Sequence, residues 1–183
     1  MVKRLSTKEL FAESIIELAE HRPLDKITIT ALSKNCGLSP RTFYDNFTDK
    51  YDLLNWIYLQ KLDKAYGRLG IELTWPQLIM ELIEVMIERS EFYKNVITHV
   101  ENDMLFLHEA DRHGYTLLMD YIMKKNPVDS NPTELAFHVK MYLHAISSMA
   151  VKWFMDGCNP ELAILAQYMT SAMPDTLKPY LLD

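Results

Sequence analysis

The sequence predicts an all-α protein. Apolar residues recur at helical spacing after recognisable N-caps along most of the 183 residues, and no segment shows the alternation of a half-buried strand. Only 5 glycines and 8 prolines are present, which argues against a loop-rich β-sandwich or barrel. With 49% apolar and 24% charged residues, the chain can bury a core, and it is too short for three domains.

Four helices are expected in the N-terminal third. Ser6 and Glu9 form a capping box at the start of the first helix, which ends near His21 because Pro23 cannot continue it. The second helix begins after the N-cap Thr28.

Glycine and caps then delimit the next two helices. Gly37 ends the second helix, since glycine adopts the left-handed conformation without strain. Ser39 and Pro40 open the third helix as N-cap and first helical residue, and Asp49 caps the fourth.

Beyond residue 66 we expect a C-terminal helical bundle. Its clearest break runs from Gly157 to Pro160, with Asn159 as N-cap and Pro160 at the first helical position. Five helices are expected here, at roughly 74–89, 91–99, 101–125, 132–156 and 160–173. The chain therefore divides into a domain at 1–50, a connecting helix at about 49–66 and a second domain at 67–183.

Charge and cysteine content exclude several classes of protein. The formal net charge is −6, but residues 1–66 carry 10 Lys/Arg against 9 Asp/Glu, whereas residues 67–183 carry 9 against 16. Uniform wrapping of nucleic acid is therefore excluded, while a localised contact is not. Cys36 and Cys158 stand far apart, so neither a disulfide framework nor a zinc site is expected. Without an apolar run of about 20 residues or a signal-peptide segment, we expect a cytoplasmic protein with no membrane contact.

The stretch from Ile29 to Phe47 has the pattern of a helix-turn-helix. Its two short helices are joined through Gly37 by too few residues to lie antiparallel, so they must cross steeply. Ser33 is small where the helices approach. The inward apolar residues are Leu32, Cys36, Leu38, Phe43 and Phe47. An ordinary helical hairpin with a glycine turn is the alternative, and the combined pattern favours DNA binding.

The segment Thr28 to Leu54 resembles the DNA-binding domain of TetR/AcrR-type transcriptional regulators. The helix-turn-helix, the aromatic pair Tyr44-x-x-Phe47, Lys50 and the Leu53-Leu54 pair follow the order of that family. The resemblance covers about residues 6–60. Two positions depart from it: Cys36 replaces a usual alanine, and Arg41 stands where many members have glycine.

The resemblance implies an operator-binding surface on double-stranded DNA. Arg41 could bond a guanine edge, Thr42 could touch a thymine methyl, and Lys50 resembles a phosphate contact. Lys3 and Arg4 could reach a neighbouring phosphate or the minor groove. The residues expected to contact DNA are Thr28, Ser39, Pro40, Arg41, Thr42, Tyr44, Asn46 and Lys50.

The C-terminal domain is expected to bind a regulator and to form a homodimer. The segment 132–156 carries two apolar stripes, so it is buried on two sides, and the resemblance implies dimerisation through the last two long helices. Polar groups that could line a ligand cavity are Tyr93, His108, Tyr142, His144 and Trp153. The histidines lack metal-ligand spacing, so neither a metal nor a cofactor is expected.

Short motifs give a finer resemblance. The runs Glu91–Val96 and Ala150–Gly157 are similar to a TetR branch that includes regulators of dihydroxyacetone kinase operons, some of which act with a protein coactivator. The effector is therefore a small molecule or a protein. The alternatives are an all-α enzyme or ligand carrier, and an interaction module that does not bind DNA. We expect no enzyme, because we find no nucleophile-base motif, metal-ligand set or phosphate loop.

Overall fold

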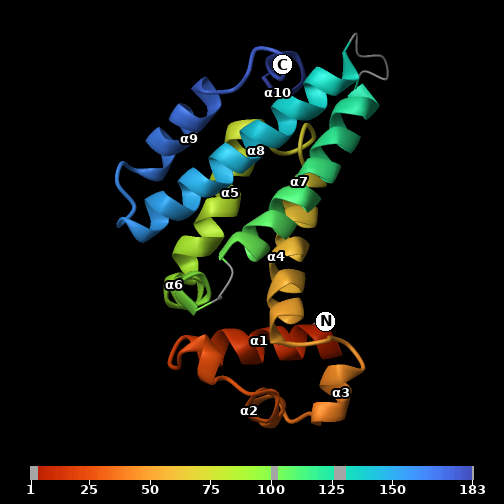
Figure 1. Ribbon diagram of the computed structural model, residues 1–183, viewed down its shortest axis with the longest axis vertical. Coiled ribbons are helices and arrows are strands. Elements are labelled where there is room, and N and C mark those ends of the chain that lie inside the picture. The colour runs from red at the N-terminus through yellow and green to blue at the C-terminus, as the bar shows by residue number, and fades with distance from the viewer. Residues whose placement is uncertain (1–3, 100–102, 126–130, 183) are drawn as a thin grey trace. The chain divides into compact units, whose positions relative to one another are not determined.

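The computed structural model describes residues 4–99, 103–125 and 131–182, with the side chains of 103–108 excepted. Within these ranges every regular element is a helix, which confirms the all-α prediction (Figure 1). The chain divides into two compact units, one spanning Met1–Tyr58 and Arg89–Phe106, the other Leu59–Glu88 and Leu107–Asp183. The boundaries expected at residues 50 and 67 stay a prediction. The structure adds that a segment after residue 88 clusters with the N-terminal helices.

The first unit contains a helix-turn-helix between longer helices. Its elements are α1 (Thr7–Ala19), the 3₁₀ helix η1 (Leu24–Lys26), α2 (Ile29–Asn35), α3 (Pro40–Tyr44), the first part of α4 (Lys50–Tyr66) and α6 (Ser90–His99). The capping box of Ser6 and Glu9 is present, as expected, and Asp49 Oδ1 accepts hydrogen bonds from the amides of Tyr51 and Asp52.

The core of this unit is aromatic and closely packed. Phe11 of α1 and Phe43 of α3 are fully buried, and their rings meet edge to face with centroids 5.1 Å apart. Phe47 continues the cluster at 5.6 Å from Phe43. A buried hydrogen bond of 2.9 Å from the Ser14 hydroxyl to the Leu32 carbonyl joins α1 to α2. The aromatic contacts hold α3 against α1, and the hydrogen bond holds α2 against α1.

The second unit is a helical bundle. It contains the last part of α4, α5 (Trp75–Glu88), α7 (Asp103–Lys125) from Leu107 onward, α8 (Pro132–Met155), α9 (Leu162–Ser171) and α10 (Lys178–Leu181). A buried relay connects three of them, because Trp75 Nε1 donates to the Tyr142 hydroxyl at 3.1 Å and this hydroxyl donates to the Met169 carbonyl at 2.9 Å.

One helix start differs from the sequence expectation. The last long helix was expected to begin at Pro160 behind the cap Asn159, but α9 begins at Leu162 with Glu161 as its N-cap residue. The Pro160 carbonyl accepts a hydrogen bond of 2.7 Å from Trp153 Nε1, so this residue belongs to the turn that closes α8.

Candidate DNA-binding interface

The turn between α2 and α3 is built as the sequence predicts. Gly37 adopts φ +71°, and the Leu38 amide donates to the Ser33 carbonyl at 2.9 Å. The Ser39 hydroxyl caps α3 by accepting from the Thr42 amide at 3.0 Å, with Pro40 at the first helical position. The two hydroxyls of Ser39 and Thr42 lie 2.9 Å apart and share a hydrogen bond.

Helix α3 has one buried side chain and an exposed face. Phe43 is fully buried, whereas Pro40 and Arg41 are exposed and Tyr44 keeps 61% of its surface accessible. Asn46 Nδ2 donates to the Thr42 carbonyl at 2.8 Å and so caps the end of the helix. Four of the expected DNA-contact residues therefore point outward from one short helix and its cap, and Thr42 and Asn46 are half-buried beside them.

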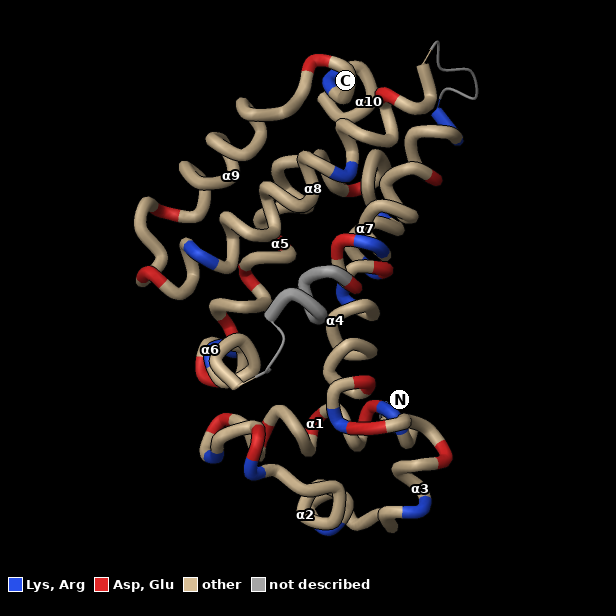
Figure 2. The backbone as a smooth tube through the Cα atoms, in the orientation of Figure 1, with Lys and Arg blue, Asp and Glu red and all other residues tan. Residues whose placement is uncertain are grey.

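The charged side chains of α2 and α3 are all cationic. Residues 26–44 contain Lys26, Lys34 and Arg41 and no aspartate or glutamate. Figure 2 shows the basic positions on α2 and α3. Arg41 and Lys34 are both exposed. Carboxylates do lie beside this segment, since Glu17 Oε2 accepts a hydrogen bond of 3.0 Å from Asn35 and Asp25 pairs with Lys26 at 3.0 Å. The exposed cations Lys34 and Arg41 on α2 and α3 can still attract a phosphate backbone, even in a protein whose net charge is −6.

Two further expected DNA contacts have partners inside the fold. The Thr28 hydroxyl caps α2 by accepting from the Ala31 amide at 3.1 Å, and its proton remains able to donate outward. Lys50 is half-buried, and its ammonium donates to the carbonyls of Leu24 at 2.7 Å, Ile27 at 3.2 Å and Asp25 at 3.3 Å. Burial lowers the pKa of Lys50, an effect that Asp25 and Asp49 oppose.

The residues expected to bind a ligand differ in how deeply they are buried and in their hydrogen-bond partners. Tyr142 and Trp153 are buried in the second unit, with their polar atoms bonded to Met169 and Pro160. Burial raises the pKa of Tyr142 to about 12. His144 is exposed and pairs through Nδ1 with Asp111 at 2.7 Å.

The other two ligand candidates occupy different places. Tyr93 is buried in the first unit, and this burial raises its pKa. The side chain of His108 lies outside the described residues, as does Lys3, while Arg4 is exposed. A groove of about 650 Å³ lies in the second unit, and none of these candidates lines it; its walls are Pro76, Met80, Ala163, Ala166, Gln167, Thr170, Ser171, Lys178 and Leu182.

Sequence reasoning missed Asn95. This residue of α6 bonds to the backbone of the connection between α1 and α2, although it lies more than 70 positions further along the chain. No local pattern marks an asparagine for such a role.

Among the described side chains, no group of three or more His, Cys, Asp or Glu is placed to hold a metal ion. None of the described helices is long and apolar enough to cross a membrane.

Comparison with known families gives two matches that together cover most of the chain. The family described as "Bacterial regulatory proteins, tetR family" matches residues 7–57, and "Transcriptional regulator C-terminal region" matches residues 73–175. Both descriptions are of transcriptional regulators.

Individual relatives agree with these matches. The HTH-type dhaKLM operon transcriptional activator DhaS of Lactococcus lactis subsp. lactis (strain IL1403) is 20% identical over 102 residues, which cover 56% of this chain and 54% of that protein. The aligned region thus spans about half the length of that relative.

Solved structures share the fold over nearly the whole chain. A structure of the dihydroxyacetone kinase operon activator DhaS has a TM-score of 0.68 at 17% identity, covering 96% of this chain and 98% of that one. The TetR family repressor AlkX from Dietzia sp. strain DQ12-45-1b has a TM-score of 0.58 at 18% identity, covering 98% and 97%. With the family matches and the helix-turn-helix described above, they lead to one conclusion: this chain belongs to the TetR family of bacterial DNA-binding transcriptional regulators.

Proposed function

We propose that the protein is a homodimer that binds a palindromic operator through α3 of each copy. The observation that carries this proposal is the exposed face of α3, with Arg41 and Tyr44 accessible over a fully buried Phe43 and no Asp or Glu within α2 or α3 themselves. Such a helix can present its N-terminal residues to base edges in the major groove. The DNA-facing set comprises Thr28, Ser39, Pro40, Arg41, Thr42, Tyr44 and Asn46, while the ammonium of Lys50 is bonded to backbone carbonyls of the fold.

A salt series tests DNA binding. We expect the protein to bind DNA from the region upstream of its own gene, with log affinity falling linearly as log salt rises, because phosphate contacts release counterions. With six to ten such contacts, affinity should drop by about 10³- to 10⁵-fold between roughly 50 and 200 mM salt. Fluorescence anisotropy with labelled operator and random DNA measures this. Absence of any salt-sensitive binding would favour a ligand-binding or interaction module instead.

The dimer is proposed to form through α8 and α9. Neither residues 141–151 nor residues 162–174 contain a Lys, Arg, Asp or Glu, and Figure 2 shows these long uncharged stretches. Large exposed apolar side chains gather on the same two helices: Phe137, Met141, Met149, Met155, Ile164 and Tyr168. An apolar surface of this kind on a folded protein marks an interaction site, and a symmetric dimer would cover it with its own copy.

Tyr168→Glu is expected to break the dimer. The side chain keeps 60% of its surface exposed, so the substitution leaves the folded unit intact but brings a charge into the apolar contact. Light scattering should give twice the 21.4 kDa chain mass for the unmodified protein and a single chain mass for the variant.

Ile71→Glu is the matched control, because Ile71 is 82% exposed and lies between α4 and α5. This variant should remain a dimer. A monomeric unmodified protein, or a dimer that tolerates Tyr168→Glu, would contradict the proposed interface.

Control is proposed to act through the second unit, by a small molecule or by a protein partner. DhaS is named an activator and AlkX a repressor, so regulators of both signs share this fold. Either kind of effector must bind the DNA-competent state and the DNA-incompetent state with different affinities. An effector with equal affinity for both would not shift the equilibrium between them.

A further inference from the structure

The connection between α1 and α2 is held by one side chain of α6. Asn95 Oδ1 accepts a hydrogen bond of 2.9 Å from the Leu24 amide, while Nδ2 donates to the carbonyls of Ala19 at 2.6 Å and Arg22 at 2.5 Å. The last carbonyls of a helix have no partner within it. A single amide from a distant part of the chain thus caps the end of α1 and binds the start of η1.

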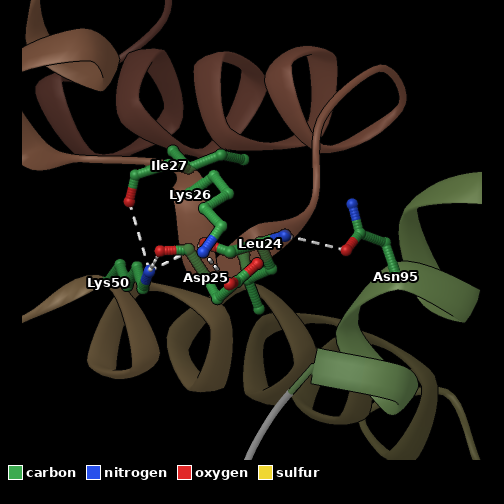
Figure 3. Close-up of polar contacts among 6 residues, drawn as sticks. All are labelled: Leu24, Asp25, Lys26, Ile27, Lys50 and Asn95. Carbon is green, nitrogen blue, oxygen red and sulfur yellow. Dashed lines mark hydrogen bonds and ion pairs between the residues drawn. The ribbon is translucent and has the colours of Figure 1, made fainter.

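The same connection is held from α4 by Lys50. Its ammonium bonds to the carbonyls of Leu24, Asp25 and Ile27, as Figure 3 shows together with the Asn95 contact. Leu24 is therefore bound at both ends of its backbone, its amide by Asn95 and its carbonyl by Lys50. The ammonium, which has three donors, thus has three carbonyl acceptors within hydrogen-bond distance.

This connection leads directly into the DNA-binding face. It ends at Thr28, the N-cap of α2, whose amino end is part of the proposed operator surface. Further along, two side-chain hydrogen bonds join α2 to α1, from Ser14 to the Leu32 carbonyl and from Asn35 to Glu17, and both lie beyond the amino end of α2. The connection through residues 19–27 is therefore what holds the amino end of α2, whereas these bonds hold its later turns.

We propose that Asn95 and Lys50 are positioning residues for operator binding, acting on α2 through residues 19–27. This inference rests on the proposed function, because it concerns the geometry of the operator-binding surface. Asn95 touches no DNA, and Lys50 contributes through its three carbonyl partners rather than by contact with a phosphate. Sequence-specific binding needs α2 and α3 held in one geometry, whereas non-specific attraction to phosphates does not.

The Asn95 half is tested with Asn95→Ala against Thr98→Ala, an exposed polar position on the same helix. Asn95→Ala should lower operator affinity by about 10-fold, while affinity for random DNA stays within about 2-fold. Thr98→Ala should change neither. Hydrogen exchange of the Leu24 amide should accelerate in Asn95→Ala only, since its acceptor is lost.

Asn95→Asp keeps the test informative where the alanine variant is poorly folded. It retains the shape of the side chain and the acceptor for Leu24, but it loses both donors. Operator affinity should again fall while the Leu24 amide stays protected. Equal losses on operator and random DNA, or no loss in either folded variant, would overturn the role of Asn95.

The Lys50 half is tested with Lys50→Met in the salt series. If the ammonium acts only through the backbone, operator affinity falls but the salt slope stays the same. A slope reduced by about 1 would show a phosphate contact and would overturn this half of the inference. If the unmodified protein itself shows no preference for any operator, the proposed function fails rather than the positioning role.

Discussion

Phe43→Ala is expected to destabilise the DNA-binding unit strongly and with it to weaken operator binding. Phe43 is fully buried, and its ring packs on Phe11 at 5.1 Å and on Phe47 at 5.6 Å. Removing a phenylalanine side chain from a packed core costs about 3–5 kcal/mol, through lost burial and through the cavity left behind. This is a large share of the roughly 5–15 kcal/mol that stabilises a native domain.

Urea unfolding followed by circular dichroism measures this effect. Phe43→Leu serves as a conservative variant, which keeps most of the volume and should lose about 1.5 kcal/mol or less. The neighbouring Tyr44→Ala is the comparison, because Tyr44 is 61% exposed and loses only an edge-to-face contact with Phe43, with ring centroids 5.6 Å apart, which is worth about 0.5–1.5 kcal/mol. Equal stability of the Phe43→Ala and Tyr44→Ala variants would contradict the arrangement of α3 described here.

Arg41→Ala is expected to reduce discrimination between operator and random DNA. Arg41 is exposed at the amino end of α3, where a guanidinium can bond two acceptors on a guanine edge. Loss of such a contact costs about 1–3 kcal/mol, which corresponds to a roughly 5- to 150-fold drop in specific affinity. Random DNA should lose much less, because only one positive charge is removed.

Lys34→Ala is the control for this charge change. Lys34 is also exposed and cationic, but it lies in the last turn of α2. Its removal should weaken binding to operator and random DNA by the same factor. The ratio of the two affinities, measured by competition at fixed salt, separates the variants, and an unchanged ratio in Arg41→Ala would exclude base reading by Arg41.

The sequence alone determined the helical architecture and the helix-turn-helix of this protein. Caps such as Ser6, Ser39 and Asp49 and the left-handed turn at Gly37 act within three or four residues. Local rules therefore predict most helix ends to within two residues of where the structure has them. The order of these signals along the chain is also what made the family recognisable.

Only the tertiary structure decided which distant groups hold those helices in place. The bonds of Asn95 to Ala19, Arg22 and Leu24 join residues more than 70 positions apart, and the Trp75–Tyr142 bond joins residues 67 positions apart. The type of a residue does not reveal whether its amide, ammonium or hydroxyl group bonds to water, to a phosphate or to a buried carbonyl. Folding selects the partner because a backbone group left unpaired on burial is costly, and that selection is made across the fold rather than along the chain.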